Sequence, residues 1–140
     1  MIGNLRRYLL ARWRELFPRR TLGRRGEDAA ARFLKRRGGR ILARGSRSAL
    51  GEIDLVVLDG KSIVFVEVKT RRHGEAGHPS EAVDTAKQRR LTRLALGFLK
   101  RHALSERPVR FDVVAVTWPQ DGRRPTIEHF PAAFEAAEPS

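Results

Sequence analysis

Asp54, Glu67 and Lys69 are the residues of this chain whose types and spacing best suit chemistry on a phosphate ester. Asp54 lies within an alternating apolar segment, and Glu67 and Lys69 flank a valine at the end of a second such segment. Two carboxylates can hold a divalent cation between them, and a neighbouring ammonium group can reach a water or a phosphate oxygen. The three side chains would suit metal-dependent hydrolysis if the fold brings them together.

A hairpin between the two segments would bring them together. The Asp-Gly pair at 59–60 predicts a two-residue turn with a positive φ at both central residues, in which residues 58 and 61 face each other. Counting outward places Asp54 opposite Phe65 and makes Asp54 and Glu67 diagonal neighbours, with Cβ atoms roughly 7 Å apart.

The predicted hairpin has one apolar face and one face that is charged at the end distant from the turn. The charged end gathers Glu52, Asp54, Glu67 and Lys69. The apolar face, which a helix must cover, carries Ile53, Leu55, Val57, Val64, Val66 and Val68. An alternative interpretation is a solvated strand end with exposed ion pairs, because a carboxylate followed two places later by lysine occurs by chance about once in a chain of this length.

Helices and further strands are predicted on either side of this hairpin. In chain order they are a helix at 22–37, strands at 41–44, 52–58 and 62–69, a helix from after Ser80 to about 104, and strands at 109–117 and 126–130. This order predicts a mixed α/β domain at 21–131, followed by a tail at 132–140. A basic amphipathic segment at 1–20 precedes the domain. It could dock on the domain, pair with another copy, lie on nucleic acid, or anchor the chain to a membrane or partner.

The composition narrows the class of protein. Cysteine is absent, which excludes disulfides, thiolate metal sites and cysteine nucleophiles. No stretch approaches the roughly 18 apolar residues that cross a bilayer, and no secretory signal is recognised, so we expect a cytoplasmic protein without stable membrane insertion. The net charge of +13 predicts attraction to polyanions, with nucleic acid as the expected partner, unless the arginines reflect only a genome rich in G and C.

Basic residues that could track a phosphate backbone gather on the long helix and in the loop before it. They are Arg71, Arg72, Lys87, Arg89, Arg90 and Arg93. These residues could equally form a solvated helix face. Binding of nucleic acid by these residues requires no chemistry, so a non-catalytic binding module that keeps the fold and the basic face is the second hypothesis for function.

Several short motifs of this chain resemble those of a known family. They are GRRGEDAA at 23–30, GEIDLV at 51–56 and FVEVKTR at 65–71, with shorter matches at 79–83, 87–91 and 110–114. Together they closely resemble the YraN-like family of bacterial proteins, which is similar to archaeal Holliday junction resolvases and, more distantly, to restriction endonucleases of the PD-(D/E)xK superfamily. The resemblance implies a restriction-endonuclease-like fold, in which a mixed β-sheet is flanked by helices.

The resemblance also implies roles for individual residues. Asp54 and Glu67, together with the Val68 carbonyl, would bind Mg²⁺ or Mn²⁺. Lys69 would position the attacking water, and Glu27 would complete the acidic site.

The activity implied is hydrolysis of phosphodiester bonds by a metal-dependent endonuclease, with DNA favoured over RNA and with branched or repair intermediates among the candidate substrates. Gln88 matches an auxiliary catalytic position. By analogy with the superfamily, two copies could assemble as a homodimer to cut both strands.

Overall fold

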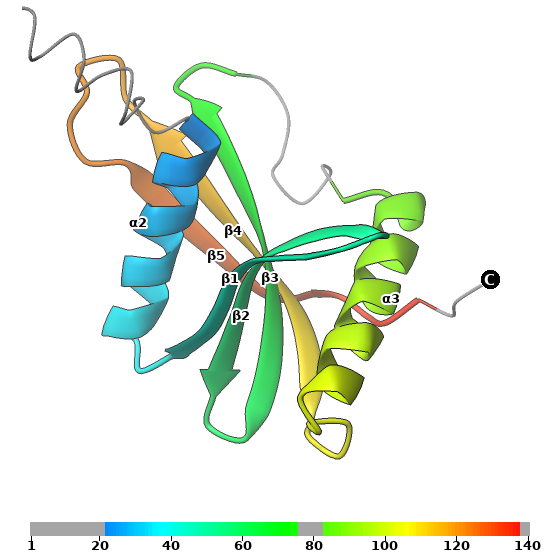
Figure 1. Cartoon of the computed structure of the whole chain (residues 1–140). Coiled ribbons are helices and arrows are strands. Elements are labelled where there is room, and N and C mark those ends of the chain that lie inside the picture. The colour runs from blue at the N-terminus through cyan, green and yellow to red at the C-terminus, as the bar shows by residue number, and fades with distance from the viewer. Residues whose placement is uncertain (1–21, 76–82, 138–140) are drawn as a thin grey trace, which may run out of the picture.

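The computed structural model describes residues 22–75 and 83–137, and Figure 1 shows how they are arranged. The elements are α2 (Leu22–Arg36), β1 (Arg40–Ser48), β2 (Gly51–Asp59), β3 (Ser62–Arg72), α3 (Thr85–Arg101), β4 (Val109–Trp118) and β5 (Thr126–Phe134). The predicted order of elements is therefore confirmed. The basic segment at 1–20 and parts of the 70–79 loop and the 132–140 tail lie outside the described residues.

The five strands form one mixed sheet in the order β1-β2-β3-β4-β5. Among the strands of the described residues, only β3 and β4 are parallel, and α3 makes the long connection that a parallel pair requires. Helix α2 covers one face of the sheet and α3 covers the other (Figure 1). The predicted mixed α/β architecture, with a sheet flanked by helices, is confirmed.

Two hydrophobic cores hold the layers together. Along β3, Val64 and Val66 pack with α2, whereas Ile63 and Phe65 pack with α3. Alternate side chains of this strand are thus buried on opposite faces, which explains its nearly continuous apolar sequence. None of the helices in the described ranges is long and apolar enough to cross a membrane.

The turn of the β2–β3 hairpin differs from the prediction. Asp59 pairs with Ser62, so Gly60 and Lys61 are the central residues, and only Gly60 has a positive φ, of 59°. The predicted pairing was wrong by two residues because glycine occupies the first central position, as a type II′ turn requires. A shift of two residues does not by itself move a side chain to the other face of the sheet.

One residue of the predicted apolar face packs elsewhere. Ile53 belongs to the α3 core, whereas Leu55 and Val57 belong to the α2 core as expected. The far end of the β1–β2 hairpin bends toward α3 (Figure 1), and a Cβ added at Gly51 would lie only 3.6 Å from the Arg90 side chain. The bend carries Ile53 to the other core.

Two element boundaries also differ from the predicted ones. Helix α3 begins at Thr85 rather than directly after Ser80, because the Asp84 side chain caps it by accepting from the Lys87 amide at 2.8 Å. Strand β5 continues beyond Pro131 to Phe134, which stacks on Phe111 with ring centroids 4.9 Å apart. The first residues after 131 therefore pack on the domain.

Candidate metal and nucleic-acid site

A glycine lets α2 approach the sheet closely enough to deliver an acidic side chain. Gly26 is buried, and a Cβ added there would overlap the Thr70 hydroxyl of β3. The next residue on the helix, Glu27, therefore lies beside the end of β2 where the polar residues gather. Close helix–strand packing is thus what makes Glu27 part of the site.

Three carboxylates meet where α2 passes β2. One oxygen each from Glu27, Glu52 and Asp54 lies within 4.8 Å of the other two, and all three residues are partly buried. Glu27 and Glu52 also line a cavity of about 390 Å³ between α2 and β1. Such a cluster of oxygen donors is the kind that Mg²⁺, Mn²⁺ or Ca²⁺ takes.

Asp54 lies at the centre of the acidic residues. Burial, followed by the neighbouring Glu67 carboxylate, raises the pKa of Asp54 to about 7, although a hydrogen bond from the Val68 amide at 2.8 Å partly opposes the increase. The pKa of Glu27 is also raised, first by burial and then by Glu52. In the antiparallel register of β2 and β3, Leu55 pairs with Val66, which places Glu67 across from Asp54. The site therefore resists holding all its negative charges at once.

Glu67 forms an ion pair with a lysine of the protein itself. Its Oε1 lies 2.5 Å from Nζ of Lys87 on α3, and its side chain is only 13% exposed. Lys69, the lysine expected to act at this site, is exposed and makes no ion pair with any residue in the described ranges. The ammonium nearest the acidic residues is thus supplied by α3 and not by β3.

The remaining predicted residues lie on α3 and at the end of β3. Gln88 donates from Nε2 to the Val83 carbonyl at 3.0 Å, so its amide is engaged at the start of α3. Arg71 donates from Nε to the Thr117 hydroxyl at 3.2 Å. Arg89, Arg90 and Arg93 are exposed along α3, and Arg72 is exposed at the end of β3.

Glu52 is a member of the cluster to which no role was assigned from sequence. It lies two residues before Asp54, so period-two alternation already placed it at the charged end of the same strand. The family resemblance assigned Glu27 to the acidic site, but only the packing of α2 on the sheet shows that Glu27 lies near Glu52. Glu52 also pairs with Arg47 of β1, with Nε 3.0 Å from Oε2.

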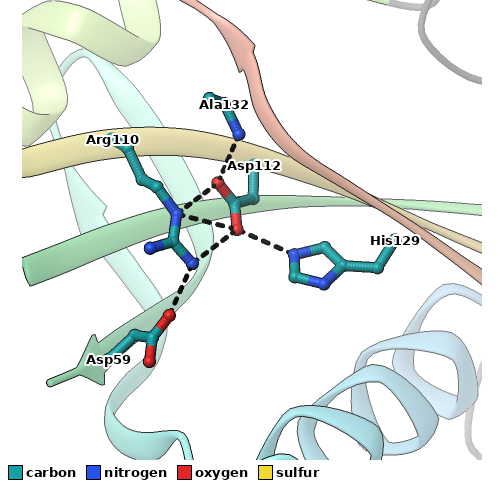
Figure 2. Close-up of polar contacts among 5 residues, drawn as sticks. All are labelled: Asp59, Arg110, Asp112, His129 and Ala132. Carbon is teal, nitrogen blue, oxygen red and sulfur yellow. Dashed lines mark hydrogen bonds and ion pairs between the residues drawn. The ribbon is translucent and has the colours of Figure 1, made fainter.

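A second buried carboxylate lies outside the acidic cluster. Asp112 of β4 is fully buried, and its oxygens accept from Arg110 Nε at 3.0 Å and from the Ala132 amide at 2.9 Å, with His129 Nε2 at 2.7 Å (Figure 2). Arg110 also donates from Nη2 to Asp59 at 2.8 Å. The carboxylate thus joins β5 to β4 and, through Arg110, to the end of β2, which is a structural role.

The fold, a mixed sheet flanked by two helices, defines an α/β protein of the restriction-endonuclease-like class. Within that class, the chain belongs to the uncharacterised protein family UPF0102, whose model matches residues 26–116. This confirms the YraN-like resemblance.

Relatives share much of the chain. It is 52% identical over 118 residues to a UPF0102 protein of Rhodopirellula baltica, covering 82% of this chain and 71% of the relative. It is 50% identical over 117 residues to a UPF0102 protein of Anaeromyxobacter dehalogenans, covering 84% and 86%. Among solved structures, SfsA of Pyrococcus furiosus in complex with Ca²⁺ matches with a TM-score of 0.32 and 14% identity, covering 76% of this chain and 60% of that one. A likeness at this level says nothing about the site.

Proposed function

We propose that this protein is a divalent-metal-dependent nuclease that hydrolyses phosphodiester bonds of nucleic acid. The observation that carries the proposal is the meeting of Glu27, Glu52 and Asp54, with oxygens within 4.8 Å of one another, in a protein of net charge +13. The cluster suits a cation, and the excess of basic side chains suits a polyanionic substrate.

The donor set fits a hard divalent cation. All three side chains of the cluster offer carboxylate oxygens, and burial together with Glu67 already disfavours the charged form of Asp54. A divalent cation would relieve that repulsion, because it interacts favourably with every carboxylate around it. Mg²⁺ and Mn²⁺ are the ions that this chemistry favours.

Within the proposed reaction, the protein positions the ligands and the substrate. A bound cation would supply a water of lowered pKa and neutralise charge on the phosphate. Asp54 is held in place by the Val68 amide, and Glu67 is next to it. Lys69, exposed beyond Glu67 on β3, is available to a phosphate oxygen or to the attacking water.

Basic side chains on α3 and at the end of β3 would hold the phosphate backbone. Arg89, Arg90 and Arg93 on α3, with Arg71 and Arg72 at the end of β3, are the candidates from sequence. Contacts of this kind position a nucleic acid without reading its sequence. DNA is the favoured substrate and RNA the alternative to test.

One observation favours a second candidate function. Lys87 already compensates Glu67, so part of the acidic charge is balanced without any metal. A protein with an internal cation in this position could keep its fold and its basic surface and bind nucleic acid without cleaving it. The non-catalytic binding module therefore stays as the alternative.

A cleavage screen separates the two functions. Linear, forked and four-way DNA and single-stranded RNA are incubated with Mg²⁺ or Mn²⁺ and with wild-type or Asp54→Ala protein, whose folding is checked by circular dichroism. We expect metal-dependent products with the wild type and none with the variant. Binding without cleavage of any substrate, and calorimetric titrations with Mn²⁺ that do not differ between the two proteins, would favour the binding module instead.

A further inference from the structure

Two cavities meet at Trp118, on the side of α2 away from the acidic cluster. One of about 340 Å³ lies between the start of α2 and the loop after β4, and the other, of about 300 Å³, lies between α2 and the start of β5. Their walls hold five arginines, which together with Trp118 we call the arginine surface: Arg25, Arg32, Arg36, Arg72 and Arg124.

The charge of this surface is not balanced by its own walls. No carboxylate is among the described residues that line the two cavities. Asp121, in the loop beside them, is paired with Arg123, at 3.6 Å between Nε and Oδ2. Gathering several guanidinium groups costs electrostatic free energy that a polyanion would recover on binding.

The aromatic rings at this surface suit the same kind of ligand. The Arg25 guanidinium lies over the Trp118 ring, 4.4 Å from its centroid. A guanidinium stacked in this way keeps its N–H groups in its own plane, where they can donate to phosphate oxygens. Phe33 lines the second cavity. Arginines interleaved with aromatic rings are typical of surfaces that follow a nucleic-acid strand.

We propose that the arginine surface binds the sugar–phosphate backbone of a nucleic-acid strand. The inference deepens the proposed function and rests on it in taking nucleic acid as the ligand, but it does not require cleavage. Of the arginines in this surface, only Arg72 is also among the nucleic-acid contacts predicted from sequence on α3 and at the end of β3. The arginine surface therefore extends the predicted contacts to another part of the molecule.

The position of α2 connects this surface to the acidic cluster. Arg24 lines the cavity that contains Glu27, and its neighbour Arg25 lines the arginine surface. Successive residues of a helix point about 100° apart, so the two arginines lie on either side of the first turns of α2. A strand that contacts both regions would cross the helix there.

A membrane is a poorer fit for this surface. Interfacial binding needs apolar side chains that can insert among lipids. The large apolar side chains that are exposed in the described ranges are Leu42, Leu50, Leu96 and Val109, none of which lines either cavity. Trp118, Phe33 and Ile127 are partly buried there instead.

The test compares two double variants that lose the same charge. Arg32→Ala with Arg124→Ala removes two exposed arginines of the surface, whereas Arg101→Ala with Arg107→Ala removes two exposed arginines near the end of α3. All proteins carry Asp54→Ala, so that binding is measured without cleavage. Fluorescence anisotropy with labelled single-stranded and duplex DNA is recorded across a salt series.

We expect the surface variant to bind roughly tenfold more weakly at moderate salt and to lower the slope of log affinity against log salt by about 2, because each lost phosphate contact lowers it by about 1. The control variant should change affinity by less than about threefold. Equal losses in the two variants would overturn the inference, since net charge alone would then explain them. Wild-type affinity in the surface variant would also overturn it and leave the proposed nuclease standing.

Failure of the proposed function has a different signature. If the Asp54→Ala protein, without further substitutions, bound neither single-stranded nor duplex DNA and also did not bind RNA, the proposal that nucleic acid is the ligand would be rejected. The inference about the arginine surface would be rejected with it. Binding to vesicles that contain phosphatidylserine is measured as the last part of the experiment. A loss of vesicle binding in the surface variant, with DNA binding unchanged, would assign the surface to a membrane and overturn the inference.

Discussion

At the scale of single residues, the site is defined by how charges compensate one another. Asp54 is buried among acidic neighbours, while Glu67 is paired with Lys87. Period-two alternation was enough to predict that Asp54 and Glu67 would lie near each other. It could not predict Lys87 as the partner of Glu67, because a cation on α3 approaches the strand only when the helix packs on the sheet.

Replacing Asp54 by asparagine should stabilise the metal-free protein at high pH. The pKa of Asp54 is about 7 in the folded protein against an ordinary value of 3.8, so folding stability falls as pH rises between these values. The asparagine side chain cannot ionise, and its carbonyl can still accept from the Val68 amide. We expect Asp54→Asn to be more stable by about 1–3 kcal/mol at pH 8 and nearly equal to the wild type at pH 4.

Urea denaturation in the presence of a chelator, at both pH values, measures this difference. An advantage of the variant that did not grow with pH would contradict the assignment of the raised pKa to Asp54. The same variant should also lose Mn²⁺ binding in calorimetry if the carboxylate is a ligand.

Removing the cation beside Glu67 should strengthen metal binding. Lys87→Met leaves the Glu67 carboxylate uncompensated, so a divalent cation gains a negative partner and loses a competitor. We expect Mn²⁺ to bind several-fold more tightly to Lys87→Met than to the wild type, and Lys69→Met, which loses an exposed lysine, to bind it as the wild type does. Calorimetric titration compares the three proteins, and weaker binding by Lys87→Met would show that Lys87 supports the site.

At the scale of elements, close packing of α2 positions the site, and one buried carboxylate joins two strands of the sheet. Gly26 sets the distance between α2 and β3, and Asp112 joins β4 to β5. The sequence indicated a helix over Gly26 and a strand over Asp112. The need for glycine at one position and for a carboxylate at the other arises only from the neighbours that the tertiary structure supplies.

An alanine at Gly26 should displace α2 from the sheet. The added Cβ would overlap the hydroxyl of Thr70, a branched side chain with little freedom to move aside. We expect Gly26→Ala to lose about 1–3 kcal/mol of unfolding free energy and to weaken Mn²⁺ binding, since Glu27 moves with the helix. Gly23→Ala is the matched control: apart from its own helix turn, no described residue lies within 4 Å of its added Cβ, so it should stabilise the helix slightly.

Thermal unfolding and calorimetry test both variants. Similar stability and metal affinity for Gly26→Ala and Gly23→Ala would mean that the close approach of α2 is not needed.

Loss of the buried carboxylate should unfold the β4–β5 edge. Asp112→Ala leaves Arg110, His129 and the Ala132 amide without their common acceptor (Figure 2), at an expected cost of about 3–5 kcal/mol. Asp59→Ala removes a pair to the same Arg110 from an aspartate that is 51% exposed, and should cost less than about 1 kcal/mol. Denaturant unfolding measures the two values, and comparable losses would contradict a structural role that is specific to Asp112.

At the scale of the whole molecule, charge is distributed unevenly around the fold. Helix α2 has carboxylates of the candidate metal site on one flank and arginines on the other, and α3 adds further basic residues. The net charge predicted a polyanionic partner but could not predict which surface of the protein would bind it. The arginine surface joins residues from α2, the end of β3 and the loop after β4, which are distant in the sequence.

The sequence by itself determined the types and order of the elements, the shared face of Asp54 and Glu67, and the family to which the chain belongs. These properties depend on local patterns, because alternation, turn residues and helix caps act over a few positions. Only the tertiary structure decided that Glu27 meets Glu52, that Lys87 compensates Glu67, and that arginines from separate elements surround Trp118. Such contacts depend on how closely two helices pack on a bent sheet, which is set by the complementarity of many side chains at once.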